Sequence, residues 1–148
     1  MTAMAGRSLV RGRAEGPALV LTEPLSFWGG VDPETGRIID RRHPQAEADV
    51  RGTILFMPSG RGSSSSSTVL AEAIRLGTAP AAIVLLEADG ILAIGAIVAS
   101  LLYGAANPVV VLDERDYVRV RSGMEVLVEA PPGSEAARVL VVEGKPGR

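Results

Sequence analysis

The residues best suited to chemistry are Arg61 and the serine run that follows it. Gly60, Arg61 and Gly62 precede five consecutive serines, Ser63 to Ser67. A guanidinium can grip a carboxylate or phosphate with two parallel hydrogen bonds. Hydroxyls at a helix start lie beside unpaired backbone amides and the positive end of the helix dipole. The segment therefore predicts a binding site for an anionic ligand, with plain helix capping as the alternative.

Two common kinds of site are excluded by the same residues. The sequence Gly60–Ser63 lacks the four-residue spacer and the lysine of a nucleotide-binding P-loop. The single histidine, His43, stands before Pro44 in a polar loop, and no nucleophile-elbow sequence surrounds the serine. A Ser-His-Asp hydrolase is therefore not indicated, and we expect His43 to be structural or to lie at the surface.

The flanking residues predict the strand and the helix that position the serines. Residues 53–57 form an apolar run that Pro58 closes, which is typical of a strand. Apolar residues then recur at helical spacing and end at Gly77, which favours a helix. They are Val69, Leu70, Ala73, Ile74 and Leu76.

Further apolar runs extend this pattern into an α/β domain. Residues 81–86 and 108–112 are typical of buried strands, and residues 90–103 of a buried helix between them. Such alternation predicts right-handed crossovers and a parallel sheet layer. Additional β structure is expected at residues 18–21, 118–120, 124–128 and 138–142. We predict a β/β/α fold with a mixed, partly parallel sheet.

The chain length predicts a single domain. A chain of 148 residues buries roughly 70% of its unfolded surface, which is enough for an independent core. We expect one domain over residues 1–148, with its core at about residues 6–130 and a peripheral tail at residues 131–148.

Two more segments hold candidate site residues. Phe27 and Trp28 stand beside Gly29 and Gly30 in a long loop rich in turn formers. The aromatic pair can be a hydrophobic plug under the loop, or a pocket wall with the glycine amides facing a ligand. Acidic residues at positions 87 and 89 follow a core strand, where α/β sheets place ligand contacts, but we favour strand-end and helix-capping roles for them.

Composition narrows the classes of function further. The net charge of −2 gives no basic patch for nucleic acid. No cysteine is present, so this chain cannot hold an iron–sulfur cluster through thiolates, and its one histidine excludes a multi-histidine metal site. Residues 90–107 carry no charge but include glycines and an asparagine that interrupt the apolar run. A membrane span needs roughly 20 predominantly apolar residues, so we expect a buried helix there. No secretory signal opens the sequence, so a cytoplasmic location without membrane contact is expected.

Four blocks of this sequence, in matching order, resemble the small, swivelling component of aconitase X. They are residues 12–16 (GRAEG), 24–36 (PLSFWGGVDPETG), 60–63 (GRGS) and 77–83 (GTAPAAI). The resemblance covers about residues 6–130, and the tail after Ala130 adds nothing to it. It implies an aconitase swivel-domain-like fold.

The resemblance also implies an activity and a partner. Members of the family are hydro-lyases in which this domain closes over an active site built largely by a larger polypeptide. An iron or iron–sulfur centre is held by that large subunit, and none is bound by the small chain alone. We therefore expect a heterodimer that is active only when both subunits are present, with a small hydroxy acid as substrate.

Residue roles follow from the same resemblance. Ser63 aligns with the serine that the family uses as proton acceptor. Arg61 is expected to orient the substrate carboxylate, and Ser64 to add a hydroxyl to it. The loop from Phe27 through Trp28 and Gly29 to Gly30 is expected to line the pocket.

Two substrates are known in the family, cis-3-hydroxy-L-proline in bacteria and mevalonate 5-phosphate in archaea. Residues 41–45 and Arg61, where archaeal members tend to carry lysine, resemble the bacterial branch. We therefore favour dehydration of cis-3-hydroxy-L-proline to Δ1-pyrroline-2-carboxylate. Phosphomevalonate dehydration, a non-catalytic anion-binding adaptor and a swivelling phosphohistidine carrier are the alternatives, the last disfavoured because His43 lies away from the helix start.

Overall fold

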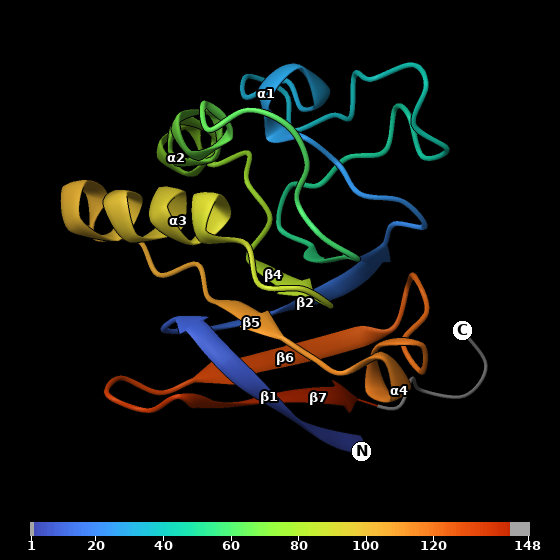
Figure 1. Cartoon of the computed structure of the whole chain (residues 1–148), viewed down its shortest axis with the longest axis vertical. Coiled ribbons are helices and arrows are strands. Elements are labelled where there is room, and N and C mark those ends of the chain that lie inside the picture. Colours follow the sequence, from blue (N-terminus) through green and yellow to red (C-terminus); the bar gives the residue numbers. More distant parts are fainter. Residues whose placement is uncertain (1, 143–148) are drawn as a thin grey trace.

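A computed structural model describes residues 2–142, which form a closed β-barrel with two long helices packed on one side (Figure 1). The strands are β1 (Thr2–Val10), β2 (Gly12–Val20), β3 (Ile54–Met57), β4 (Ala82–Leu85), β5 (Val109–Val111), β6 (Glu125–Ala130) and β7 (Ala136–Val142). The helices are α1 (Phe27–Gly30), α2 (Ser66–Leu76), α3 (Gly90–Tyr103) and α4 (Glu114–Tyr117).

The barrel has the strand order β1-β5-β4-β3-β2-β6-β7 and contains both parallel and antiparallel pairs. Strands β2, β3, β4 and β5 pair in parallel, while β1, β6 and β7 close the barrel with antiparallel pairs. The predicted strands at residues 53–57, 81–86 and 108–112 are therefore confirmed, as is the mixed, partly parallel sheet. Closure into a barrel was not predicted.

The parallel strands have two buried faces, so each contributes to two cores. Along β3, Ile54 and Phe56 point into the barrel, whereas Leu55 and Met57 point to the helices. Successive side chains of a strand point to opposite faces, which explains the unbroken apolar run in the sequence. In the barrel core the rings of Phe56 and Tyr117 meet edge to face, with centroids 5.8 Å apart.

Both chain ends contribute longer strands than the sequence indicated. The β structure expected at residues 124–128 and 138–142 is confirmed by β6 and β7. Instead of a short strand at residues 18–21, the nine-residue strands β1 and β2 begin the fold. Near the other end, β7 pairs with β1 and β6, and its Val139 is fully buried. The predicted peripheral tail is thus wrong for residues 136–142, which complete the barrel; residues 143–148 lie outside the described part of the chain.

The predicted β structure at residues 118–120 is also wrong. Asp113 caps a short helix there, because its carboxylate accepts a hydrogen bond from Asp116 N at 3.0 Å. The chain leaves α4 through a turn in which Val120 N donates to Tyr117 O at 3.2 Å. Local capping therefore prevails over the β propensity of the valines.

Helix α3 is buried on one face only, which corrects the prediction of a fully buried helix. Leu92 and Ala99 are buried against the sheet and α2, whereas Ile94 and Leu101 are exposed. None of the helices in residues 2–142 combines the length and hydrophobicity that crossing a bilayer demands.

The two long helices meet at Gly95 of α3. A Cβ atom at that position would stand 2.7 Å from Ser67 O and 3.1 Å from Ser67 Cα. Both are backbone atoms of the first turn of α2, which cannot rotate away as a side chain can. The absence of a side chain at position 95 thus sets how close the serine-bearing end of α2 lies to α3.

We expect Gly95→Ala to destabilise the fold by about 1–3 kcal/mol, the usual cost of overpacking a close contact. Gly90→Ala in the same helix is the matched control, because a Cβ atom there would meet no other part of the chain within 4 Å. The control is expected to be neutral or stabilising, since alanine favours helices over glycine by about 1 kcal/mol. Urea unfolding of both variants measures the difference, and equal stability of the two would contradict the close-contact explanation.

Candidate functional site

A pocket opens where the loops after β2, β3 and β4 meet, at the carboxyl ends of these parallel strands. Its volume is about 220 Å³. Such strand ends are where α/β sheets bind ligands, because the loops from neighbouring strands converge there. The lining residues are Leu25, Phe27, Gly60, Arg61, Gly62, Ser63, Ser66, Asp89, Ile91 and Leu92.

Close packing shapes the loop between β3 and α2. A Cβ atom at Gly60 would collide with the carboxylate of Asp89, and one at Gly62 would stand 2.6 Å from Ser26 Oγ. Gly62 also has φ of +94°, a conformation that side chains disfavour. The two glycines therefore allow the chain to carry Arg61 and Ser63 into the pocket.

The serines of the run have different roles, and one cap does not explain them all. Ser65 is the N-cap residue of α2, but its side chain makes no capping hydrogen bond. Ser63 Oγ instead accepts from Ser65 N at 3.1 Å and tightens the turn before the helix. Ser63 is exposed and lines the pocket, so its hydroxyl can meet a ligand.

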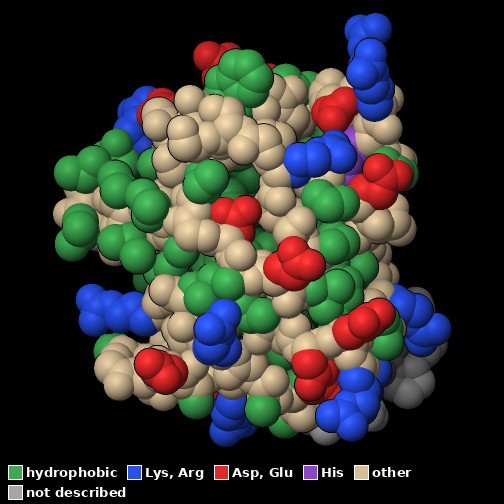
Figure 2. Space-filling view, viewed as in Figure 1, with side chains coloured by type: hydrophobic (Ala, Val, Ile, Leu, Met, Phe, Trp, Pro, Cys, Tyr) green, Lys and Arg blue, Asp and Glu red, His purple; other side chains and the backbone are tan. Residues whose placement is uncertain are grey.

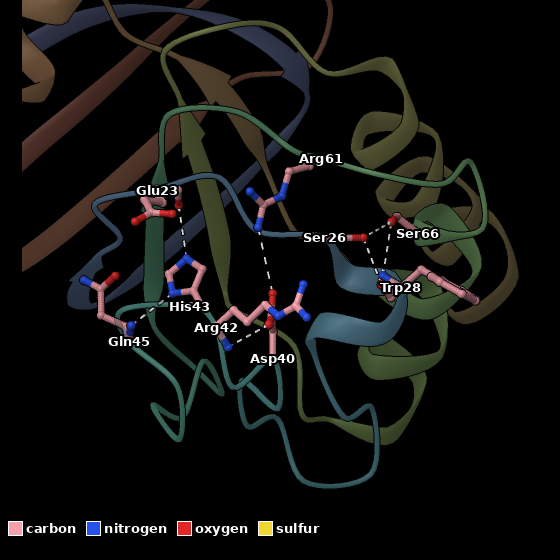
Figure 3. A network of polar contacts seen from close by, with 9 residues as sticks. All are labelled: Glu23, Ser26, Trp28, Asp40, Arg42, His43, Gln45, Arg61 and Ser66. Carbon is pink, nitrogen blue, oxygen red and sulfur yellow. Dashed lines mark hydrogen bonds and ion pairs between the residues drawn. The ribbon is translucent and has the colours of Figure 1, made fainter.

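Ser66 is buried and joins α2 to the loop that carries Phe27 (Figure 3). Its Oγ accepts from Trp28 N at 3.1 Å and lies 3.4 Å from Ser26 Oγ. Ser26 Oγ in turn donates to Trp28 O at 2.9 Å. These bonds hold one pocket wall against the helix start, a role that the sequence did not distinguish among five adjacent serines.

Arg61 and Asp89 are the charged residues of the pocket lining. The Arg61 guanidinium lies 3.8 Å from Asp40 Oδ2 and is half exposed, so it is oriented but not fully neutralised (Figure 3). Asp89 caps α3, since its Oδ1 accepts from Ile91 N at 2.9 Å and from Leu92 N at 3.1 Å. The predicted capping role of Asp89 is confirmed, and the fold also places this residue in the pocket.

His43 is structural, as expected. It is buried, its Nδ1 accepts from Gln45 N at 3.0 Å, and its Nε2 lies 3.2 Å from Glu23 O (Figure 3). Because Nδ1 is an acceptor, Nε2 carries the proton and donates to the carbonyl. Because both ring nitrogens contact backbone groups, His43 cannot serve as a base for Ser63. The same contacts leave no free ring nitrogen for phosphorylation, which argues against the phosphohistidine-carrier alternative.

The structure brings together only part of the predicted site. Ser63, Arg61 and Phe27 line the pocket, whereas Ser64, Trp28, Gly29 and Gly30 do not. Phe27 is fully buried and Trp28 is 58% exposed, so the aromatic pair divides between the core and the surface. Phe27 is both plug and pocket wall, and the pocket roles expected for the other four residues are not supported.

The donor atoms of the described chain do not suit a metal ion. Within residues 2–142, no three His, Asp or Glu side chains gather closely enough to hold one. The pocket instead offers one guanidinium, one carboxylate and a hydroxyl at a helix start. That set can bind and orient a small charged molecule, but it places no strong base beside Ser63.

Comparisons with a family model and with individual proteins point to the same family. Residues 3–137 match the family described as the aconitase X swivel domain. A cis-3-hydroxy-L-proline dehydratase of Pseudomonas aeruginosa is 45% identical over 150 aligned residues, which cover 95% of this chain but only 26% of that protein. A phosphomevalonate dehydratase small subunit of Methanothermobacter thermautotrophicus is 44% identical, over 86% of this chain and 93% of that subunit.

A solved structure shows the same architecture. The holo-form of aconitase X from Thermococcus kodakaraensis has a chain that superposes with a TM-score of 0.82 at 37% identity. The match covers 97% of this chain and 100% of that one. The barrel with its two long helices is therefore the architecture of that chain as well.

Proposed function

This chain belongs to the aconitase X swivel-domain family, and we propose that it is the small subunit of a hydro-lyase that dehydrates cis-3-hydroxy-L-proline to Δ1-pyrroline-2-carboxylate. The observation that carries the proposal is the pocket at the strand ends, which holds Ser63 and Arg61 together. Family membership confirms the resemblance found in four sequence blocks and extends it to residues 3–137.

A larger polypeptide is part of the proposal. This chain spans about a quarter of the Pseudomonas aeruginosa dehydratase but nearly all of the Methanothermobacter thermautotrophicus small subunit. In the first protein the matching region belongs to a longer chain, and in the second it is a separate subunit by name. We infer that the present chain likewise acts beside a large subunit.

Ser63 is the proposed proton acceptor. The proton on the carbon next to the substrate carboxylate passes to Ser63 Oγ, and the bond between C3 and its hydroxyl breaks. The hydroxyl takes up one proton, so that the α-proton and the hydroxyl are lost overall as water. The resulting enamine takes up a proton at C3, releases the proton on its nitrogen and becomes the imine Δ1-pyrroline-2-carboxylate. The exposed position of Ser63 on the pocket lining supports this role.

A serine needs help to act as a base, and this chain supplies little of it. A helix N-terminus contributes at most about 2 kcal/mol, or about one and a half pKa units, which is far from enough to form an alkoxide at neutral pH. The imidazole of His43 is engaged elsewhere. We infer that further cationic groups and the exclusion of water come from the closed complex.

The charges of the pocket favour an amino acid over a phosphate ester. Cis-3-hydroxy-L-proline carries one carboxylate and one ammonium group, which suit Arg61 and Asp89 respectively. The charged groups of mevalonate 5-phosphate, a carboxylate and a phosphate, are both negative, and the Asp89 carboxylate would repel them. The zwitterion is therefore the better match to the charges that this chain contributes.

The iron centre expected for this family belongs, in our proposal, to the large subunit. The described residues of this chain do not form a ligand set for it. A metal centre there would assist the departure of the 3-hydroxyl. The contribution of this chain is to bind the carboxylate, accept the proton and exclude water.

The test is to co-express the chain with the large-subunit polypeptide of the same organism, purify the complex anaerobically and assay both substrates. We expect turnover of cis-3-hydroxy-L-proline by the complex and none by the small chain alone. Turnover by the isolated chain would contradict the two-subunit proposal. A stable complex with neither activity would favour the anion-binding adaptor.

Phosphomevalonate dehydration is the second candidate. It is favoured by the relative from Methanothermobacter thermautotrophicus, whose identity of 44% nearly equals the 45% of the hydroxyproline enzyme. Preferential turnover of mevalonate 5-phosphate in the same assay would replace our substrate assignment while leaving the hydro-lyase class intact.

A further inference from the structure

Helix α3 carries an uncovered apolar surface on the side away from the sheet. The exposed fractions are 54% for Ile94, 41% for Ile97, 38% for Val98, 80% for Leu101 and 66% for Leu102. We call these five residues the α3 apolar face. Figure 2 shows hydrophobic side chains gathered at the left edge of the molecule, where Figure 1 places α3.

This face differs from the scattered apolar residues of an ordinary protein surface. Its side chains follow one stripe of a single helix, and no charged residue occurs anywhere in residues 90–112. Contiguous apolar surface of this kind marks a site of association. If this uncharged helix face were permanently exposed to water, it would lower the solubility of the protein without stabilising the fold.

Two hollows border the α3 apolar face, so the surface around it is uneven. One, of about 620 Å³, lies at the end of α3 and is lined among others by Leu101, Gly104, Ala130 at the end of β6 and Pro131 in the turn that follows. The other, of about 220 Å³, lies between α2 and α3 beside Val98 and Leu102. Protruding apolar side chains next to hollows are the shape that a complementary protein surface requires.

We propose that the α3 apolar face is the docking surface for the large subunit, an inference that rests on the function proposed above. The first turn of α3 already lines the substrate pocket through Asp89, Ile91 and Leu92. A polypeptide lying along α3 therefore reaches the pocket mouth, which the proposed reaction needs to have closed. One helix thus carries both a pocket wall and the docking surface.

The relatives support this occupant over a second copy of the chain. The region equivalent to this chain is 26% of one dehydratase, covalently joined to the remainder, and a separate small subunit in another. A separate subunit must hold its partner by surface contacts alone. Residues 2–142 contain no metal ligand set and place no strong base beside Ser63. A second copy of the same chain would not supply these groups, so it would not complete the site.

The test compares Leu101→Glu with Val118→Glu in complexes with the co-expressed large subunit. Leu101 is the most exposed residue of the face, while Val118 is a matched apolar residue, 66% exposed, directly after α4, the helix labelled in Figure 1. Both side chains project into solvent, so neither charge should unfold the domain. We expect Leu101→Glu to weaken association at least about tenfold, in the range of interface hot spots, and Val118→Glu to leave it unchanged.

The outcomes separate this inference from the proposed function. Equal association of Leu101→Glu and wild type would overturn the docking surface, even if the complex is an active dehydratase. Loss of association in Leu101→Glu alone would uphold it, even if the wild-type complex turns over neither substrate. Self-association of the isolated chain that Leu101→Glu abolishes, with no binding of the large subunit, would assign the face to a second copy and overturn the proposal.

Discussion

Replacing Ser63 by alanine in the two-subunit complex is expected to lower kcat for cis-3-hydroxy-L-proline at least about 10²-fold. The loss of a positioned acid–base group costs typically 10²- to 10⁴-fold, because the substrate proton then has no acceptor in the transition state. KM should change little, because Ser63 is proposed to accept a proton in the transition state and not to hold the substrate; in the structure its Oγ accepts a hydrogen bond from Ser65 N. Steady-state kinetics on the purified complex measures both constants.

Ser64→Ala is the matched control for this prediction. Ser64 is the next residue, is also exposed, and does not line the pocket. Its removal is expected to leave kcat within about threefold of wild type, as a surface change that disturbs no reacting group should. Near-normal kcat in Ser63→Ala, or an equal loss in both variants, would remove Ser63 from the catalytic role.

Arg61→Gln is expected to raise KM by roughly 10- to 100-fold, with a smaller effect on kcat. A hydrogen bond to a charged group contributes about 1.5–3 kcal/mol, and tenfold in KM corresponds to about 1.4 kcal/mol. Arg61 is the pocket's only cation among residues 2–142, so no described neighbour replaces it at the substrate carboxylate. Arg61→Lys should recover part of the loss, because the charge remains while the two-pronged geometry does not.

The variant Asp40→Asn tests whether the ion pair with Asp40 matters for substrate binding by Arg61, because it removes the partner charge and leaves Arg61 in place. The Arg61–Asp40 pair is loose, at 3.8 Å, and partly exposed, and such pairs contribute little energy. We expect a change in KM of less than about threefold. A larger rise in KM for Asp40→Asn than for Arg61→Gln would mean that Asp40, and not Arg61, governs substrate binding.

The elements around the site could be predicted because their signals are local. The apolar runs that became β3, β4 and β5 and the helical spacing that became α2 are readable from a few neighbouring residues. Strands buried on both faces need unbroken apolar sequence, and helix α2 needs a recurring apolar face. The glycine–serine junction between β3 and α2 was visible for the same reason.

Strand β1 could not be predicted in the same way, although β structure was expected over most of its partner β7, at residues 138–142. Their pairing joins residues from opposite ends of the chain, such as Thr2 with Val141. Strand β1 mixes apolar side chains with arginine, serine and glycine, so it has no strong pattern of its own. Its stability comes from the partner strand and not from local preference.

The sequence by itself determined the chemistry that this protein can offer: a serine and an arginine at a helix start, no thiol, and one histidine. Only the tertiary structure decided which residues share the pocket. It brought Asp89 and Phe27 to Ser63, turned Trp28 outward, buried Ser66 and left one face of α3 in solvent. The physical reason is that residue type is a local property, whereas burial and proximity arise when parallel strands bring distant loops to one sheet edge.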